Sequence, residues 1–338
     1  MSGTTMHATS PLVGIALAAY EPPIEFFREQ LSSIAAQSYA EWFCVIGIDG
    51  DARRLMAEPA LAPFVDDSRF VWSPNPERLG HRRNFERTIA RAAELGAELI
   101  ACADQDDIWH PEKIARLVAS IAEAGPLSLV HSDMQMLRDG RIEHESVWRA
   151  SKQGVEHDRL DEILIANVVN GCSMLFDAEL ARRYPVIPAS FGFHDHWFAA
   201  VASAHGGIHR VDEALMQYRQ HGANVVGASE FDWRVRVPGR GTWRSEIDAC
   251  VARWQRVRER AAELESVGIR PGAAQRLMLL SRVDLGALLL LRGLALTWRS
   301  PRLSRYLVRL GIGKLASTLG LGRGRNATEA PAEDMTNV

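Results

Sequence analysis

Residues 99–109 read LIACADQDDIW, an apolar segment that runs directly into three carboxylates. An apolar run of this kind is typical of a strand buried on both faces of a parallel sheet. Crowded carboxylates repel one another, and a bound cation relieves the repulsion. Their hard oxygen atoms suit Mg²⁺ or Mn²⁺, which use one or two carboxylates together with substrate phosphate oxygens. Asp104-Gln105-Asp106-Asp107 is therefore a candidate metal site, and a solvated acidic loop is the alternative.

The sequence on either side of this cluster alternates between strand and helix patterns. Helices are expected after Pro23, near Arg83 and at Pro111, between apolar strands at residues 12–19, 43–48, 70–72, 99–103 and 128–132. This alternation predicts an α/β fold with a doubly wound, mostly parallel sheet. Ligands of such sheets bind beyond the carboxyl ends of the strands, where both Asp49 and the DQDD cluster fall.

Composition narrows the class of protein. The chain has 338 residues, of which 47% are hydrophobic and 24% charged, as in folded domains. A net charge of -3 argues against nucleic acid as a partner. The four cysteines form no CxxC pair, which favours free thiols in a reducing compartment. The first ten residues lack a secretory pattern, and no apolar run approaches the ~20 residues of a membrane span, so a cytoplasmic location is expected.

Seven segments in a fixed order resemble one enzyme family over roughly residues 11–228. They are VGIALAAYE (13–21), IDGD (48–51), NPERLGHRRN (75–84), ADQDDIWHPEKI (103–114), NGCS (170–173), HDHW (194–197) and YRQHGANVVG (218–227). The chain resembles a family 2 inverting glycosyltransferase of the GT-A fold, close to the rhamnosyltransferase-like branch of bacterial polysaccharide biosynthesis.

The resemblance implies a metal site and a donor site. Asp104 and Asp106 would be the DxD carboxylates, with Asp106 contacting the metal, Mg²⁺ or Mn²⁺. Asp107 would share the metal or bind a sugar hydroxyl, and His221 would complete the metal site. In the IDGD turn, Ile48 replaces the first of two family aspartates. The implied nucleotide-sugar-binding residues are Tyr20, Glu21, Asp49, Asn75, Arg83, Asp104, Asp107 and Arg219. For His221, Arg219 and Arg83, incidental surface positions are the alternative.

Asp195 sits where the family carries its catalytic acidic motif, which implies a general base. Inverting transfer needs one carboxylate to take the proton of the acceptor hydroxyl as it attacks the anomeric carbon. A helix N-cap beside Gly192 is the alternative role for Asp195. The implied acceptor side holds Gly171, His194 and Trp197, whereas Cys172 is expected only to pack.

These segments together predict transfer of a single sugar from a dTDP- or UDP-linked donor, with rhamnose as the first guess, to a hydroxyl of a glycan or lipid-linked glycan. The Gln-x-x-Arg-Trp motif of the processive members is absent from the sequence. Two alternatives stay open. A sugar nucleotidyltransferase would need a glycine-rich basic loop where AAYEPP (18–23) stands. A non-catalytic sugar-nucleotide binding module would not need the base at Asp195.

Four regions are expected along the chain: a disordered N-terminus (1–10), the GT-A domain (11–235), a C-terminal helical region (236–325) and a disordered tail (326–338). Pro238-Gly239-Arg240-Gly241 marks the boundary between the second and the third. From residue 270 to 325 there are eleven Arg or Lys against one acid. Arg302, Arg305 and Arg309 share one helical face, and Leu303, Leu307 and Leu310 another. Such a helix either contacts an anionic membrane, at the inner face of the plasma membrane, or packs on the catalytic domain or in a homodimer.

Overall fold

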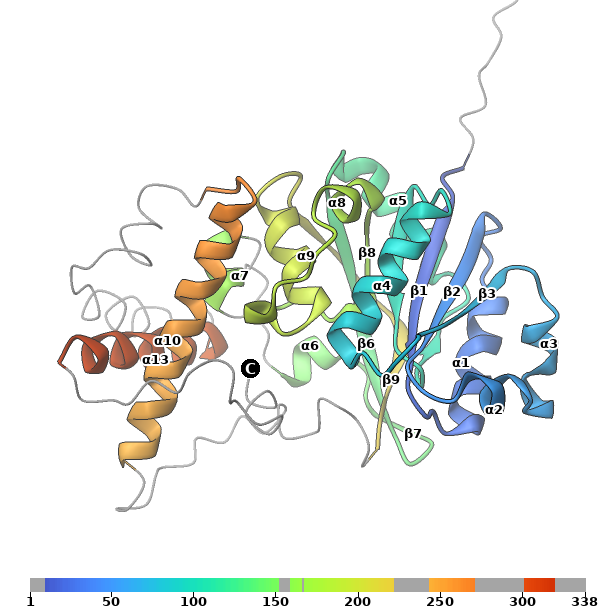
Figure 1. The fold of residues 1–338 in the computed structure, drawn as a ribbon, viewed down its shortest axis with the longest axis horizontal. Helices are drawn as coiled ribbons and strands as arrows, with labels where there is room; N and C mark the ends of the chain where they lie inside the picture. The colour runs from blue at the N-terminus through green and yellow to red at the C-terminus, as the bar shows by residue number, and fades with distance from the viewer. Residues whose placement is uncertain (1–9, 152–158, 166, 222–242, 271–300, 320–338) are drawn as a thin grey trace, which may run out of the picture.

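The computed structural model describes residues 10–151, 159–165, 167–221, 243–270 and 301–319, as one sheet flanked by helices (Figure 1). The strands are β1 (Val13–Ala19), β2 (Trp42–Ile48), β3 (Phe70–Pro74), β4 (Leu99–Ala103), β5 (Ile108–Trp109), β6 (Leu129–Arg138), β7 (Arg141–His144), β8 (Met174–Asp177) and β9 (Ile208–Gln220). The α-helices are α1 (Ile24–Ala35), α2 (Ala52–Met56), α3 (Ala62–Val65), α4 (His81–Glu94), α5 (Lys113–Ala124), α6 (Val147–Ala150), α7 (Leu160–Ile165), α8 (Ala178–Arg183), α9 (His194–Ser203), α10 (Trp243–Ser266) and α13 (Pro301–Thr318). Short 3₁₀ turns are η1 (Pro59–Leu61), η2 (Gly171–Ser173) and η3 (Ala189–Phe191).

The strands form one sheet in the order β3-β2-β1-β4-β8-β6-β9-β5, with β7 paired to β6. β1 to β4 are parallel to one another, and β6 is parallel to β9. β8 is antiparallel to both β4 and β6, and β5 is antiparallel to β9. The expected strands are therefore present, but the sheet is mixed, because three short strands that the apolar pattern did not indicate, β5, β7 and β8, all pair antiparallel.

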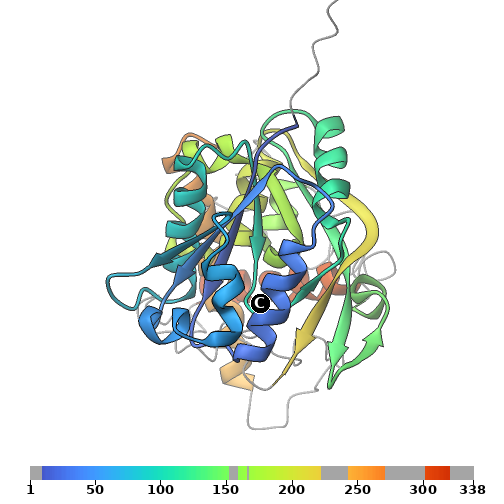
Figure 2. The ribbon, with the colours of Figure 1, turned by 90° about the vertical axis from the view of Figure 1, so that its right-hand side faces the viewer.

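Each face of the sheet is buried in its own core. Val13, Ile15 and Leu17 of β1 belong to the core beneath α1 and α5. Figure 2 shows this face of the sheet, with α1 in blue in front of the strands. Ala16 of the same strand points to the opposite core, beneath α4, α8 and α9. This alternation explains why the strands read as continuous apolar runs: both faces are covered by helices.

Glycine allows α4 to lie close against the strands. A Cβ at Gly47 would stand 2.0 Å from Thr88 Oγ1 and 2.6 Å from Asn84 Oδ1, so only glycine fits there. The Asn84 side-chain amide donates to the Gly47 carbonyl at 2.9 Å. The close packing fixes the N-terminal end of α4 over the carboxyl end of β2.

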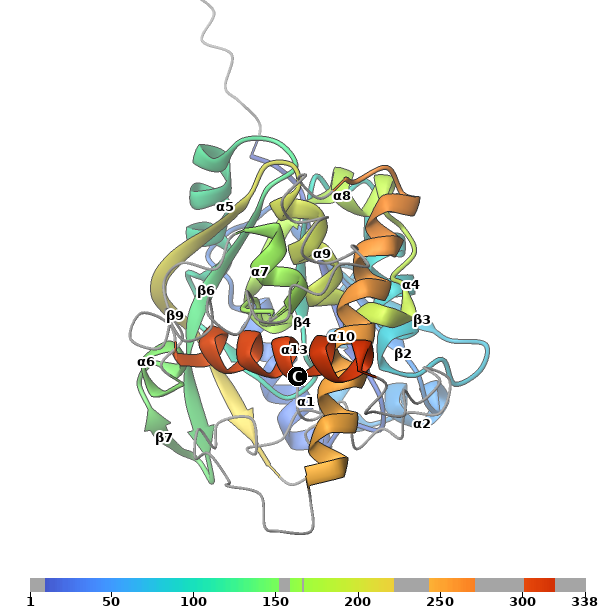
Figure 3. The same cartoon turned by 90° about the vertical axis from the view of Figure 1, so that its left-hand side faces the viewer.

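The C-terminal helices pack on the α7 side of the sheet domain and on each other, with α13 crossing α10 in Figure 3. The buried Arg260 of α10 donates from Nε to the Ser190 carbonyl at 2.8 Å and from Nη1 to the Leu164 carbonyl at 3.1 Å. In α13, Leu310 and Lys314 are buried whereas Arg309 is exposed. Among the described helices, none is both long and apolar enough to cross a membrane.

Several expectations fall on residues that the structure does not describe. They are the chain ends (1–9 and 326–338), the Pro-Gly-Arg-Gly boundary (238–241), part of the segment 218–227, and the side chains of Arg302, Leu303, Arg305 and Leu307.

Candidate active site

The parallel register of β1, β2 and β4 brings their carboxyl ends to one edge of the sheet. Ala19 pairs with Ile48, so Tyr20 and Asp49 follow at the same level, and Leu17 pairs with Ala103, so β4 ends two residues earlier and Asp104 follows beside Ala18. The Asp49 N–H donates to the Ala19 carbonyl at 2.8 Å, and the Tyr20 N–H donates to Gln105 Oε1 at 2.8 Å. Residues 104–107, here called the acidic loop, are thereby hydrogen-bonded to the residue that follows β1.

Asp49 organises the loop before α4. Its buried carboxylate accepts hydrogen bonds from the Leu79 N–H at 2.6 Å, the Gly80 N–H at 2.7 Å and Asn75 Nδ2 at 2.9 Å. Asn75 also donates to Asn84 Oδ1 at 2.9 Å. Two predicted donor-binding residues, Asp49 and Asn75, are thus bonded to each other and shape the segment 75–80.

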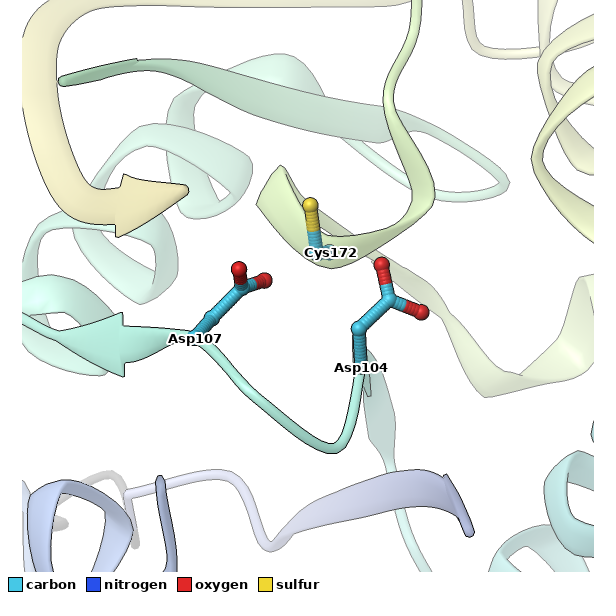
Figure 4. Close-up of side chains that lie close together, drawn as sticks. All are labelled: Asp104, Asp107 and Cys172. Carbon is cyan, nitrogen blue, oxygen red and sulfur yellow. The ribbon is translucent and has the colours of Figure 1, made fainter. Parts of the chain in front are cut away.

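The acidic loop meets the η2 turn. Asp104, Asp107 and Cys172 offer ligand atoms that all lie within 4.8 Å of one another, and Figure 4 shows the three side chains converging. Asp107 is fully buried, and its Oδ2 has no hydrogen-bond partner among the described residues. Asp104 is partly exposed.

Burial and mutual repulsion make this loop electrostatically unfavourable without a cation. Burial raises the pKa of Asp104 to about 7, and repulsion from Asp106 and Asp195 adds to the shift. The pKa of Asp107 is raised well above its usual value, first by burial and then by Asp106 and Asp104. Burial lowers the pKa of Lys113 to about 8, against the attraction of these carboxylates. With its three carboxylates ionised, the loop would carry more negative charge than one buried ammonium offsets.

Residues at the end of β9 hydrogen-bond to the same acidic loop. The Arg219 N–H donates to Asp107 Oδ1 at 3.1 Å, and its Nε donates to the Asp106 carbonyl at 2.8 Å. Its guanidinium also pairs with Glu29 and lies 4.3 Å from the centre of the Phe26 ring. His221 Nε2 lies 2.7 Å from Asp106 Oδ2. The predicted pair of Asp106 and His221 is thus brought together, while Arg219 is engaged in holding the loop.

Asp195 faces the acidic loop across the η2 turn. Its Oδ2 accepts from the Gly171 N–H at 3.2 Å, and Cys172 is the next residue of that turn. Its Oδ1 accepts from the His196 N–H at 2.5 Å. Burial raises the pKa of Asp195 to about 7. The helix begins at His194 with Phe193 as its N-cap, so the alternative N-cap role does not belong to Asp195.

The other predicted residues are placed as follows. A Cβ on Gly171 would stand 2.3 Å from His194 Nε2, so this glycine permits the close approach of η2 and α9. The buried His194 ring stacks on Phe85 at 3.7 Å. Trp197 is fully buried, and its indole N–H donates to the Tyr184 carbonyl at 3.2 Å, so its ring lies in the core. Tyr20, Glu21 and Arg83 are exposed, with the Arg78 guanidinium 4.3 Å from the Tyr20 ring centre.

Sequence reasoning missed Lys113 and the position of Cys172. Lys113 is fully buried beneath the loop, where Nζ donates to the Cys172 carbonyl and lies 3.8 Å from the centre of the Trp109 ring. The signal was available, because Lys113 stands four residues before Leu117 and eight before Ile121, on the buried stripe of α5. For Cys172 the sequence held no signal, since only the tertiary fold brings η2 to the acidic loop.

The donor set fits a divalent cation. Two carboxylates and a thiol converge at Asp104, Asp107 and Cys172, and His221 pairs with Asp106 in the same loop. Asp107 Oδ2 is buried and has no hydrogen-bond partner in the described part of the chain. Asp104 and Asp107 with Cys172, or Asp106 with His221, are the groups that would hold it.

Comparison with known proteins places this geometry in context. Residues 15–181 match the family model described as glycosyl transferase family 2. An uncharacterized glycosyltransferase from Methanocaldococcus jannaschii is 28% identical over 108 residues, which span 31% of this chain and 36% of that protein. The chain thus covers about a third of the length of this curated relative.

Two solved structures share the fold. TarS from S. aureus, solved in complex with UDP-GlcNAc, has a TM-score of 0.50 at 12% identity, covering 91% of this chain and 92% of the other. The mannosyltransferase PcManGT from Pyrobaculum calidifontis, solved with GDP-Man and Mn²⁺, has a TM-score of 0.50 at 15% identity, covering 92% and 88%. The predicted GT-A fold with additional C-terminal helices is confirmed.

Proposed function

We propose that the chain, whose residues 15–181 match the model of glycosyl transferase family 2, transfers a single sugar from a nucleoside-diphosphate donor to a hydroxyl group, with inversion. The proposed acceptor is a glycan or a lipid-linked glycan of cell-surface polysaccharide synthesis. Asp195 is the proposed base, and the carboxyl edge of β1, β2 and β4 is the proposed donor site.

The observation that carries the proposal is the position of Asp195 relative to the acidic loop. The Gly171 N–H bonds Asp195 while the neighbouring Cys172 lies against Asp104 and Asp107. Asp195, a partly exposed carboxylate with a pKa of about 7, is therefore separated from the acidic loop only by the η2 turn. A group whose pKa lies near working pH suits proton abstraction, because it is sufficiently ionised and still basic.

The proposed chemistry divides between these two sets of groups. Asp195 accepts the proton of the acceptor hydroxyl as its oxygen attacks the anomeric carbon, and the bond to the diphosphate breaks on the opposite side. The Gly171 N–H holds the carboxylate and orients it. A cation, when bound, would neutralise the leaving diphosphate. Asp49 supports the donor by fixing segment 75–80, through the Leu79 and Gly80 N–H groups.

Donor identity is proposed from resemblance. Rhamnose on dTDP or UDP is the first donor to test, from the branch that the motifs resemble. UDP-GlcNAc and GDP-mannose are the next, because TarS and PcManGT were solved with them.

A thermal-shift screen tests the proposal, with dTDP-rhamnose, UDP-GlcNAc and GDP-mannose each added with and without Mn²⁺. We expect one donor to raise the melting temperature, and more so with the metal. That donor is then used in a transfer assay in which NMR reads the anomeric configuration of the product. The proposal would be overturned if neither these three donors nor a wider set of nucleotide sugars stabilised the protein. It would also be overturned if the product retained the anomeric configuration of the donor.

A further inference from the structure

Cys172 presents its sulfur to the same point as two carboxylates from a separate part of the chain (Figure 4). We propose that Cys172 is a ligand of the cation held by Asp104 and Asp107, and that its sulfur makes this site prefer a thiophilic divalent cation over Mg²⁺. The inference rests on the proposed function only in assuming that the acidic loop holds a cation.

The geometry of the three groups fits one coordination shell. Their ligand atoms lie within 4.8 Å of one another, and Cys172 and Asp107 are both buried. Sulfur–zinc and oxygen–zinc bonds of about 2.3 and 2.1 Å place two ligands of one ion at most about 4.4 Å apart, so small side-chain movements suffice. Asp107 Oδ2, fully buried and without a hydrogen-bond partner among the described residues, points to a missing ligand.

The turn that carries the sulfur is held rigidly. The carbonyl of Cys172 accepts from Lys113 Nζ, whose ammonium lies over Trp109. Ser173 donates from its Oγ to the Asn170 carbonyl at 2.9 Å and from its N–H to the same oxygen at 3.0 Å. Because the backbone on both sides of the sulfur is bonded, the thiol is directed at the carboxylates before a cation arrives. Such preorganisation is what a metal site needs from its supporting residues.

The nature of the donor atoms decides which cation is favoured. Carboxylates suit Mg²⁺ and Mn²⁺, whereas sulfur favours softer ions such as Zn²⁺, Cd²⁺ and Co²⁺. Binding replaces the S–H bond of Cys172 with a sulfur–metal bond and releases the proton to solvent. The sulfur adds little to the binding affinity for Mg²⁺, so a site of mixed sulfur and oxygen ligands binds thiophilic ions more tightly than Mg²⁺.

Metal binding by the full chain tests the inference without any transfer assay. Co²⁺ is added to the metal-free protein while thiolate-to-cobalt charge-transfer absorption is recorded, and titration calorimetry measures Cd²⁺, Mn²⁺ and Mg²⁺ affinity. The variant is Cys172→Ser, which keeps a hard oxygen donor. Its matched control is Cys44→Ser, a second fully buried thiol that lies in β2 within the core. Cys172→Ala repeats the test if the hydroxyl disturbs folding.

We expect the wild type and Cys44→Ser to show the charge-transfer band and to bind Cd²⁺ more tightly than Mg²⁺. Cys172→Ser should lose the band and about 10- to 100-fold of Cd²⁺ affinity, with Mn²⁺ affinity nearly unchanged. A band that is absent from the wild type, or that persists in Cys172→Ser, would overturn the inference. Sugar transfer with Mn²⁺ but no charge-transfer band would support the proposed function and overturn the role of Cys172. A band without sugar transfer would support the role of Cys172 and count against the proposed function.

Discussion

Asp195 lies in the first turn of α9, where two backbone N–H groups reach its carboxylate and burial still dominates its chemistry. The hydrogen bonds favour the ionised form and burial disfavours it more strongly, so the pKa is raised to about 7. A carboxylate on the surface would be a far weaker base. This environment therefore suits the role of base near neutral pH that we propose for Asp195.

Replacement of Asp195 by Asn should lower the turnover number by about 10²- to 10⁴-fold, because the amide cannot accept the proton. Donor affinity should change little, since the proposed donor site is the carboxyl edge of β1, β2 and β4, and Asp195 belongs to α9. Steady-state transfer and calorimetry with the donor measure the two effects. Asp212→Asn is the control, because its carboxylate is 79% exposed. Near-normal turnover in Asp195→Asn would show that another group is the base.

The raised pKa values also predict how stability varies with pH. Asp104 and Asp195 bind a proton more tightly in the folded chain, with pKa values of about 7 against an ordinary aspartate value of 3.8. Their contribution is fully present below pH 3.8 and is lost as pH rises through about 7. For metal-free protein in chelator, these groups should therefore make the free energy of unfolding fall across that window. Urea unfolding at several pH values measures it, and Asp195→Asn should show a shallower decline.

At the scale of elements, the Asp49 carboxylate joins β2 to the segment that leads into α4. Its three hydrogen bonds come from Leu79, Gly80 and Asn75, and Asn84 closes the arrangement onto Gly47. Gly80, with φ of 77°, caps α4 in a conformation that favours glycine. The loop that would cover the donor thus takes its shape from a single carboxylate.

Asp49→Ala should lower the free energy of unfolding by about 1–2 kcal/mol, because it leaves the partly exposed Leu79 and Gly80 N–H groups without this acceptor, and a fully buried donor without a partner costs about 1–3 kcal/mol. Faster hydrogen exchange at Leu79 and Gly80 would localise the effect. Asp51→Ala is the control, because it removes one N-cap bond to Arg54 in the neighbouring helix α2. Equal losses in the two variants, with unchanged exchange at Leu79, would contradict the role assigned to Asp49.

Most of the main elements could be predicted from periodicity, and the short ones could not. β1, β2 and β4 carry apolar runs that need no partner to be recognised, and the predicted bounds differ by at most one residue. β5 spans two residues and β8 four, so their existence depends on pairing with β9 and with β4 and β6. In the site, the order of the motifs singled out Asp49, Asp106, Asp195 and His221, and of these the structure places Asp106 and His221 in direct contact. The location of the Trp197 ring could not be predicted from sequence, because an aromatic residue beside a catalytic motif gives the same sequence pattern whether it lines a pocket or packs in the core.

At the scale of the whole molecule, the sequence allows two roles for the C-terminal helices: contact with an anionic membrane, or packing on the catalytic domain or in a homodimer. Of the two sequence-based alternatives, packing on the sheet domain is what the described part of α13 supports, since Leu310, Gly313 and Lys314 face α10 or its neighbours and are buried. A Cβ at Gly313 would stand 2.0 Å from the Cys250 carbonyl oxygen, so the two helices touch backbone to backbone there. The exposed side of this half of α13 carries Arg309 and Ile312.

Gly313→Leu should therefore separate α13 from α10, because the larger side chain cannot enter the contact with Cys250. We expect faster proteolysis within residues 301–319 and a gain of binding to anionic vesicles in flotation, as the freed apolar face becomes available. Ser317→Leu, at an exposed position of the same helix, adds the same side chain without breaking the contact and should change neither measurement. If the wild type already floats with anionic vesicles and Gly313→Leu adds nothing, the membrane contact uses a surface other than the one that α10 covers. If proteolysis is also unchanged, the crossing at Gly313 does not hold α13 in place.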